Sequence, residues 1–459
     1  MGGACMYDLI VLGAGPGGYL AAEHASEAGL KTLLLEKEHI GGVCLNEGCI
    51  PTKTLLHSAK LYHSAREGDA YGVSCRDVTL DHSKVIDRKE TVIKTLVGGV
   101  QAGLKKSGAE VRMAKAVIQG RTADGIRILA DGQEVCGKSM ILATGSHTVI
   151  PPISGLKEAL DSGFAVTSRE LLKMRTLPER LVIVGGGVIG LEMASYFAMA
   201  GTQVSVVEML PKIAGPVDEE LSHLLQKDCE KQGITFYLSA KATAFREGTV
   251  VIEKDGAVSE LTCDTVLVCL GRRATTQDFG VESLQLEVSR TGIVVDGQCR
   301  TTLPNVYAVG DCNGRAMLAH TAYREADVAV NTILGKRDRM RYDAIPSVIY
   351  TVPEIAAVGM TEEEARQAGF SPVVTRLPMT YSGRYLAEYG QGGMCKMVFD
   401  QQRQILLGAH IMGGPASEFI FSCGMMIETE MTASHMKEFV YPHPTVCEII
   451  KEAIFQTKL

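Results

Sequence analysis

Two cysteines stand close together in the segment GGVCLNEGCIPTK, which runs from Gly41 to Lys53. Cys44 and Cys49 are five positions apart, and a regular helix would hold such positions about 8 Å from each other. A disulfide needs α-carbons roughly 4.4–6.8 Å apart, so the helix must be distorted, and Gly48 supplies that freedom. A strained bridge that closes so small a loop stabilises a fold little and is easily reduced. The pair therefore indicates either a redox centre or two unrelated buried thiols.

The length, net charge and cysteine content limit the classes of protein to which this chain can belong. A chain of 459 residues is too long for one hydrophobic core, so we expect two to four domains. The formal net charge of -7 argues against general binding of nucleic acid. The sequence contains no long apolar run and no signal peptide, and its 13 cysteines are odd in number and scattered. We expect a cytoplasmic protein with no metal site and no membrane or nucleic-acid partner.

Two glycine-rich segments, beginning YDLIVLGAGPGG and LVIVGGGVIG, share one pattern of apolar strand, glycine turn, helix and second strand. Their fingerprint glycines are Gly13, Gly15 and Gly18 in the first copy and Gly185, Gly187 and Gly190 in the second. Each copy ends its second strand with an acid, Glu36 or Glu208, about 23 residues after the first glycine. Two such copies in matching context indicate two Rossmann-like dinucleotide-binding domains, rather than two turns without a ligand.

The physical reason for this pattern is the approach of a pyrophosphate to a helix N-terminus, where free N–H groups and the helix dipole favour an anion. The acid accepts hydrogen bonds from ribose hydroxyls. Glu208 would repel a 2′-phosphate, and no Arg or Lys stands directly beside it in VVEMLP. The second site therefore favours NAD over its phosphorylated form, although Lys212 is nearby in the sequence.

Three further strand ends carry turn residues: Thr144 and Gly145 in MILATGS, Gly271 in VLVCLGRR, and Gly310 with Asp311 in NVYAVGD. Such turns border ligand crevices at the carboxyl ends of parallel strands. From about Ile345 the pattern changes, since SVIYTVPEIAAVGMT, CKMVFD and ILLGAHIMG are typical of an antiparallel sheet. The segment ASEFIFSCGMMIETE has helical spacing.

Together these motifs resemble the class I pyridine nucleotide-disulfide oxidoreductases, over essentially the whole chain from Met6. The resemblance is carried, in order, by GAGPGGY, GGVCLNEGCIPTK, ATGS, GGGVIGLE, GRR, YAVGD, LAH, YTVPE and HPTVCE. It implies an α/β fold with two Rossmann-like domains, for FAD and NAD, and a C-terminal α+β dimerisation domain. The implied division is 1–147 and 273–342 for the two parts of the FAD domain, 148–272 for the NAD domain and 343–459 for the interface domain.

The resemblance also implies the roles of the redox residues. Cys44 would exchange with the substrate, and Cys49 would lie against the flavin. Lys53 would lie beside the flavin and pair with Glu192 from the second glycine-rich helix. From residue types alone, either charge is more often a solvated surface group.

The segment YPHPTVCEII brings His443 and Glu448 close together in the sequence. Thiol exchange needs a base, because only the thiolate attacks, and a carboxylate can orient a histidine for that task. A lone histidine before proline is more often structural, but the resemblance makes His443 the acid–base group, supplied by the partner subunit of a homodimer.

The same resemblance assigns the FAD contacts. Glu36 would bind the ribose and Asp311 the ribityl chain, while Thr144, Gly145, Gly271 and Gly310 line the crevice. Residues Met317 to His320 would begin a helix, and Ala319 in that turn would face the flavin.

Within this family, the residues fit best an enzyme that oxidises dihydrolipoyl groups on a carrier protein and reduces NAD+. That carrier would belong to a 2-oxoacid dehydrogenase or a glycine cleavage system. The main rival is glutathione reductase, which prefers NADPH and so conflicts with Glu208. A silent flavoprotein scaffold, from a different class, would be expected to lack a cysteine, His443 or Glu448, and all are present.

Overall fold

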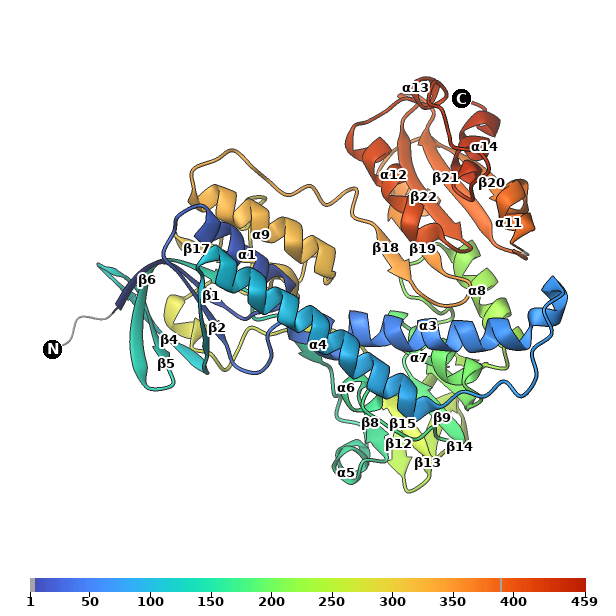
Figure 1. Cartoon of the computed structure of the whole chain (residues 1–459), viewed down its shortest axis with the longest axis horizontal. Coiled ribbons are helices and arrows are strands. Elements are labelled where there is room, and N and C mark those ends of the chain that lie inside the picture. Colours follow the sequence, from blue (N-terminus) through green and yellow to red (C-terminus); the bar gives the residue numbers. More distant parts are fainter. Residues whose placement is uncertain (1–4, 389) are drawn as a thin grey trace. The chain divides into compact units, whose positions relative to one another are not determined.

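The computed structural model describes residues 5–388 and 390–459, and Figure 1 shows their helices and strands. The chain forms two compact units. Unit 1 comprises the residues up to Thr54, Asp87–Ile150 and Gly271–Arg341, and unit 2 comprises Leu55–Ile86, Pro151–Leu270 and Tyr342–Leu459. The chain passes between the units inside α3 (Cys49–Arg66) and again inside α4 (His82–Ser107).

Unit 1 is built on a seven-stranded sheet in the order β3-β2-β1-β6-β5-β4, with β17 also paired to β6. Its strands are β1 (Cys5–Leu12), β2 (Thr32–Glu36), β3 (Glu110–Met113), β4 (Ala116–Thr122), β5 (Gly125–Ala130), β6 (Gln133–Leu142) and β17 (Val306–Ala308). Strands β1, β2, β3, β6 and β17 run parallel, whereas β4 and β5 extend the sheet antiparallel. The central strands are apolar at almost every position because both faces of a parallel sheet are covered.

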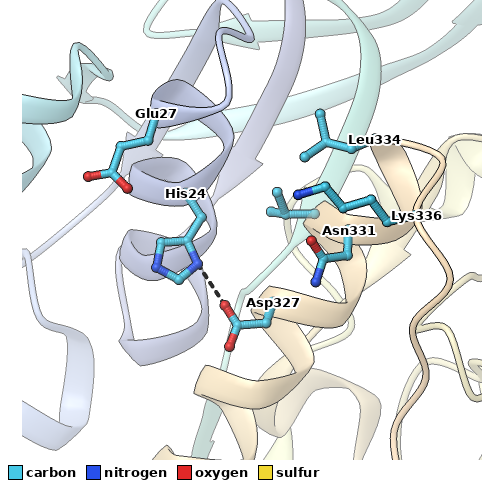
Figure 2. A pocket seen from close by; sticks show the side chains of 7 residues that line it. His24, Glu27, Asp327, Asn331, Leu334 and Lys336 are labelled. Carbon is cyan, nitrogen blue, oxygen red and sulfur yellow. Dashed lines mark ion pairs between the residues drawn. The ribbon is translucent and has the colours of Figure 1, made fainter.

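Helices α1 (Pro16–Glu27) and α9 (Ala319–Ile333), far apart in the sequence, lie side by side in unit 1 (Figure 1). Two side-chain contacts join them: the hydroxyls of Tyr19 and Tyr323 are 2.6 Å apart, and His24 Nδ1 lies 2.6 Å from Asp327 Oδ1 (Figure 2). The remaining short elements of unit 1 are β7 (Ser146–Thr148), β16 (Arg272–Ala274), α2 (Gly42–Glu47), η2 (Val281–Leu284) and η3 (Gly310–Asn313).

Unit 2 contains a second parallel sheet in the order β11-β10-β9-β15-β8, beside an antiparallel sheet β12-β13-β14. The strands are β8 (Ala165–Val166), β9 (Arg180–Val184), β10 (Gln203–Glu208), β11 (Thr235–Leu238), β12 (Ala240–Arg246), β13 (Thr249–Lys254), β14 (Ala257–Thr262) and β15 (Thr265–Val268). The accompanying helices are α5 (Leu156–Ser162), α6 (Ser168–Leu171), α7 (Val188–Met199), α8 (Glu219–Lys231) and η1 (Gly68–Tyr71).

The C-terminal part of unit 2 is an antiparallel sheet in the order β18-β19-β22-β21-β20. Its strands are β18 (Ser347–Ile349), β19 (Ile355–Gly359), β20 (Pro372–Pro378), β21 (Met394–Asp400) and β22 (Leu406–Met412). Helix α12 (Ala416–Glu428) packs on β19 and β22, and α14 (Glu448–Gln456) packs on β20 and β21 (Figure 1). Shorter helices are α10 (Glu362–Gln367), α11 (Gly383–Ala387), α13 (Ala433–Met436) and η4 (Met379–Tyr381).

The predicted fold class is confirmed, with two Rossmann-like sheets and an antiparallel C-terminal sheet. The sequence analysis did not predict β20, which begins and ends with proline. This strand forms an edge of its sheet, and an edge is where a strand tolerates proline. Within the described residues, every helix is too short or too polar to cross a membrane. The four-segment domain division stays a prediction.

Candidate active site

The two cysteines of the opening motif lie on either side of a break between helices. Helix α2 ends at Glu47 and α3 begins at Cys49, while Gly48 between them has φ −141° and ψ −108°. This break is the distortion that the spacing predicted, and it brings the thiols of Cys44 and Cys49 within hydrogen-bonding distance. Both residues are partly exposed. Two adjacent thiols can release two electrons and two protons by forming a disulfide.

The electrostatics of this pair keep Cys44 protonated. The hydrogen bond with Cys49, followed by burial, raises the pKa of Cys44 far above its usual range. The positive charge of Lys53 acts in the opposite direction and favours the thiolate. Lys53 therefore lies close enough to Cys44 to influence its charge.

Helix α2 packs directly on the first glycine-rich turn. A β-carbon on Gly42 would lie 2.7 Å from the α-carbon of Gly15, and Gly42 itself has φ +58°. Only glycine fits this contact, so it places the cysteine-bearing helix against the start of α1. The cysteine pair and the first glycine-rich turn thus belong to one local structure.

The first glycine-rich turn is tightened by its own strand and by Glu36. Gly13 has φ +98°, and a β-carbon on Gly18 would lie 1.8 Å from the carbonyl oxygen of Gly13. Glu36 Oε2 accepts a 2.7 Å hydrogen bond from the backbone N–H of Ala14. A β-carbon on Gly15 would meet open space, at the N-terminus of a helix that has no side-chain cap. The turn therefore leaves room and backbone donors for a pyrophosphate.

The second turn, in unit 2, repeats this geometry. A β-carbon on Gly190 would lie 2.0 Å from the carbonyl oxygen of Gly185, and one on Gly187 would meet open space. Glu208 Oε2 accepts a 2.7 Å bond from the N–H of Gly186, and its Oε1 accepts one of 2.8 Å from the N–H of Leu210. The residues of both turns fit a dinucleotide.

In the sequence, the nearby Lys212 left open the choice between NAD and its phosphorylated form. In the structure, the ammonium group of Lys212 donates hydrogen bonds to backbone oxygens. Its Nζ donates to the carbonyl of Gly215 at 2.7 Å and to that of Val217 at 2.5 Å. This ammonium is therefore committed to the chain and does not balance the carboxylate of Glu208.

The three predicted strand-end turns meet in unit 1. Ser146 donates a 2.5 Å hydrogen bond to Asp311 Oδ2, and Arg272 donates to Ser146 Oγ at 2.7 Å and to its carbonyl at 2.6 Å. Thr144 donates to the carbonyl of Thr275 at 2.8 Å. The glycines of these turns, Gly145, Gly271 and Gly310, all have positive φ. Hydrogen bonds therefore join the three turns, and Ser146 orients the carboxylate of Asp311.

Ser146 and Arg272 were not among the residues selected from the sequence. Their motifs, ATGS and GRR, were recognised, but only Thr144, Gly145 and Gly271 were chosen from them. Helix α9 begins at Ala319, and its N-cap Leu318 offers no side-chain hydrogen bond to the first amides. The helix thus begins within the predicted segment Met317 to His320.

Glu192 lies on α7 and is 4% exposed. Its Oε1 accepts a 3.0 Å hydrogen bond from the N–H of Tyr350. Lys53 lies in unit 1 and Glu192 in unit 2, and their pairing stays a prediction.

His443 and Glu448 form a hydrogen-bonded pair in unit 2. Nδ1 of His443 lies 3.1 Å from both carboxylate oxygens of Glu448, and the N–H of Thr445 donates to Glu448 Oε2 at 3.0 Å. The Thr445 bond, and then His443, hold the pKa of Glu448 below its usual range. The imidazole is 78% exposed and Glu448 only 13%. An anchored carboxylate thus orients an exposed ring whose Nε2 is available to a substrate.

Comparison with protein families matches residues 7–326 to the pyridine nucleotide-disulphide oxidoreductase family and residues 345–454 to its dimerisation domain. The dihydrolipoyl dehydrogenase of Mycoplasma pneumoniae is 37% identical, over 98% of this chain and 99% of that protein. That of Chlorobaculum tepidum is 38% identical over 98% and 97%.

Solved structures show the same fold. The HOCl-induced flavoprotein disulfide reductase RclA of Escherichia coli superimposes with a TM-score of 0.86 at 27% identity, covering 98% of this chain and all of that one. LpdA of Mycobacterium tuberculosis has a TM-score of 0.88 at 23% identity, covering 99% of each chain.

Proposed function

This chain belongs to the pyridine nucleotide-disulphide oxidoreductase family, and we propose that it is a dihydrolipoyl dehydrogenase that passes electrons to NAD+. The observation that carries this proposal is the Cys44–Cys49 pair, held at a helix break against the first dinucleotide turn. A thiol pair so placed can exchange with a substrate dithiol on one side and serve a flavin on the other.

The substrate dithiol reduces the Cys44–Cys49 disulfide in two successive thiol–disulfide exchanges. One sulfur of the dihydrolipoyl dithiol attacks Cys44 of the Cys44–Cys49 disulfide, which forms a mixed disulfide and releases Cys49 as a thiolate. The second substrate sulfur then attacks the first, which releases Cys44 and leaves the lipoyl ring oxidised. The proton of that second sulfur passes to the Cys49 thiolate, so the electrons and protons of the substrate remain on the enzyme dithiol. Reoxidation of this dithiol by NAD+ yields NADH and a proton.

We assign the proton transfers of this exchange to His443. A dihydrolipoyl thiol attacks only after it loses its proton, and an imidazole oriented through Nδ1 by Glu448 can accept that proton at Nε2. When Cys44 leaves, the same ring returns the proton. His443 would come from the partner subunit of a homodimer, which accords with the match of residues 345–454 to a dimerisation domain.

The residues around the first turn fit FAD, which supplies two-electron transfer between the thiol pair and NAD+ when it is bound. We assign the pyrophosphate to the turn of Gly13, Gly15 and Gly18, the ribose to Glu36 and the ribityl chain to Asp311. Thr144, Gly145, Gly271, Gly310 and Ala319 would line the same site. Lys53, paired with Glu192, would lie beside the flavin.

The residues of the second turn fit NAD+. Gly185, Gly187 and Gly190 would hold its pyrophosphate, and Glu208 would accept the ribose hydroxyls. A 2′-phosphate would meet this carboxylate without a cation to balance it, since Lys212 is bound to backbone oxygens. This charge arrangement disfavours the rival glutathione reductase, which would use NADPH.

We further propose that the substrate arrives on a lipoyl-bearing carrier protein of a 2-oxoacid dehydrogenase or glycine cleavage system, in the cytoplasm. The domain division would be that of the family, with FAD segments 1–147 and 273–342, an NAD domain 148–272 and an interface domain 343–459.

The test compares two reactions on the purified protein: reduction of NAD+ by dihydrolipoamide, and reduction of glutathione disulfide by NADPH. We expect rapid NADH formation and little or no glutathione reduction. Activity with glutathione alone would contradict both the substrate and the role of Glu208. Bound FAD with neither activity would instead support a scaffold.

A further inference from the structure

Glu325 is a charged residue with no solvent exposure, in the second turn of α9. A buried carboxylate is costly unless it is hydrogen-bonded, so its partners indicate what it is for. Its Oε2 accepts a 2.6 Å bond from the backbone N–H of Gly310 and a 2.9 Å bond from Nδ2 of Asn313. These are the first and last residues of η3, the turn that carries Asp311.

Besides its bonds to Glu325, the turn is restrained by close packing on α9 and by a further hydrogen bond of Asn313. Gly310 has φ +72°, and a β-carbon there would lie 3.2 Å from that of Ala322 on α9. Asn313 is 3% exposed, and its Oδ1 accepts a 3.0 Å bond from the N–H of Arg315. Both ends of the turn are therefore tied to one oxygen atom of Glu325.

Glu325 is itself fixed, because α9 is anchored on more than one side. Tyr323 bonds to Tyr19 of α1 at 2.6 Å, and Asp327 pairs with His24 of the same helix (Figure 2). Arg324 binds Asp338 with bonds of 2.8 and 2.5 Å. A carboxylate on so well-anchored a helix can act as a rigid support for the turn.

Asp311, between the two tied ends, accepts a 2.5 Å hydrogen bond from Ser146. Its backbone is thus set through Glu325 and its carboxylate through Ser146 and Arg272. Nothing in the thiol exchange uses Glu325, yet its contacts converge on the residue assigned to the cofactor.

We propose that Glu325 is a positioning residue of the flavin site, which holds the Gly310–Asn313 turn so that Asp311 is presented to the ribityl hydroxyls of FAD. The inference rests on the proposed function, because it takes FAD as the ligand of the site that contains Asp311. Glu325 would therefore contribute to the affinity for FAD as well as to the stability of the fold.

The test measures FAD dissociation from the purified holoenzyme, by the flavin fluorescence released on dilution, for wild type, Glu325→Leu and Glu325→Gln. Leucine removes both bonds, and we expect FAD affinity to fall by about 10–100-fold. Glutamine retains an oxygen that can accept both bonds, so its affinity should stay within about threefold of wild type. Wild-type affinity in the leucine variant, or an equal loss in both variants, would overturn the proposal.

Asp338→Asn is the matched control, because it weakens one anchor of α9 without touching the turn, while the contacts of Tyr323 and Asp327 with α1 still hold the helix. It should lower the melting temperature and leave FAD affinity unchanged. A loss of FAD equal to that of Glu325→Leu would mean that any loosening of α9 releases the cofactor, contrary to the proposal.

If Glu325→Leu fails to fold, Asn313→Ala replaces it. This variant removes one bond and keeps the buried carboxylate, so a loss of about threefold or more is expected, and none would overturn the inference. A wild-type protein that binds no FAD overturns the proposed function and the inference together. A wild type that binds FAD beside variants that bind it equally well overturns only the inference.

Discussion

Nδ1 of His443 lies 3.1 Å from both carboxylate oxygens of Glu448, and the histidine is exposed while the glutamate is largely covered. The carboxylate is held in turn by the N–H of Thr445. The arrangement fixes the tautomer of the ring, because Nδ1 must carry the hydrogen that it donates, and leaves Nε2 as the base. It is the geometry that a proton carrier for thiol exchange requires.

Replacing His443 should remove the proton carrier and leave the flavin chemistry intact. We expect His443→Gln to lower kcat/KM for dihydrolipoamide by about 10²–10⁴-fold, the usual size of an acid–base contribution. Glu448→Gln should cost about 10–100-fold, since it weakens a charge-assisted bond but keeps the ring. Steady-state kinetics with NAD+ measure both values.

The control for these variants is electron transfer from NADH to an artificial one-electron acceptor, which takes electrons from the flavin without thiol exchange. That rate should equal the wild-type rate in both variants. A parallel fall in the two reactions would contradict an acid–base role and indicate damage to the cofactor site.

Glu208 should determine the choice between NAD+ and NADP+. Glu208→Gln removes the charge that faces the ribose, and we expect the KM for NAD+ to rise about 10-fold or more. Glu208→Arg should in addition improve the use of NADP+, because it supplies a cation for the 2′-phosphate. The ratio of kcat/KM for the two dinucleotides is the measurement, and an unchanged ratio in Glu208→Arg would contradict the assignment.

Protonation of Asp338 should lower the stability of the folded protein at acidic pH. Its bonds with Arg324, and then Asn331, lower the pKa of this carboxyl from 3.8 to about 2. A depressed folded-state pKa adds stability that is fully present above about pH 4 and is lost as the pH falls toward 2. Because Arg324 is 47% exposed, we expect only about 1 kcal/mol. Melting temperatures between pH 5 and pH 3 should fall less steeply in Asp338→Asn, and equal slopes would contradict this.

Lys396 should be essential to the stability of unit 2. It is 3% exposed, in the middle of the C-terminal sheet, and its Nζ lies 2.8 Å from Asp218 and 2.6 Å from Glu220. Lys396→Met leaves the buried Asp218 charge without its cation, which costs about 3–5 kcal/mol. Adding Asp218→Asn, which keeps the cap oxygen of α8, should recover part of the loss. Thermal melts of the single and double variants test this coupling, and equal melting temperatures would argue against it.

The two dinucleotide turns were predictable from the sequence because all their parts are local. Strand, glycines, helix and acid lie within one short segment, and the backbone bonds to Glu36 and Glu208 form inside it. The break at Gly48 was predictable for the same reason, since it follows from the spacing of two nearby cysteines.

Contacts between distant segments could not be predicted from residue types. Ser146 and Asp311 are 165 residues apart, and nothing in either motif pairs them. Lys396 and Glu325 are charged residues that the sequence would place on the surface, yet tertiary partners bury both. The strand β20 was missed because proline hides an edge strand from pattern analysis.

Exchange with the substrate depends, in this account, on the disulfide that Cys44 forms with Cys49. The most direct test of this dependence is the rate of NAD+ reduction by dihydrolipoamide in Cys44→Ser, beside the transfer of electrons from NADH to an artificial acceptor in the same protein. We predict that the first rate falls at least about 10³-fold while FAD stays bound and the second rate persists. Dihydrolipoamide oxidation at near the wild-type rate in this variant would contradict the account.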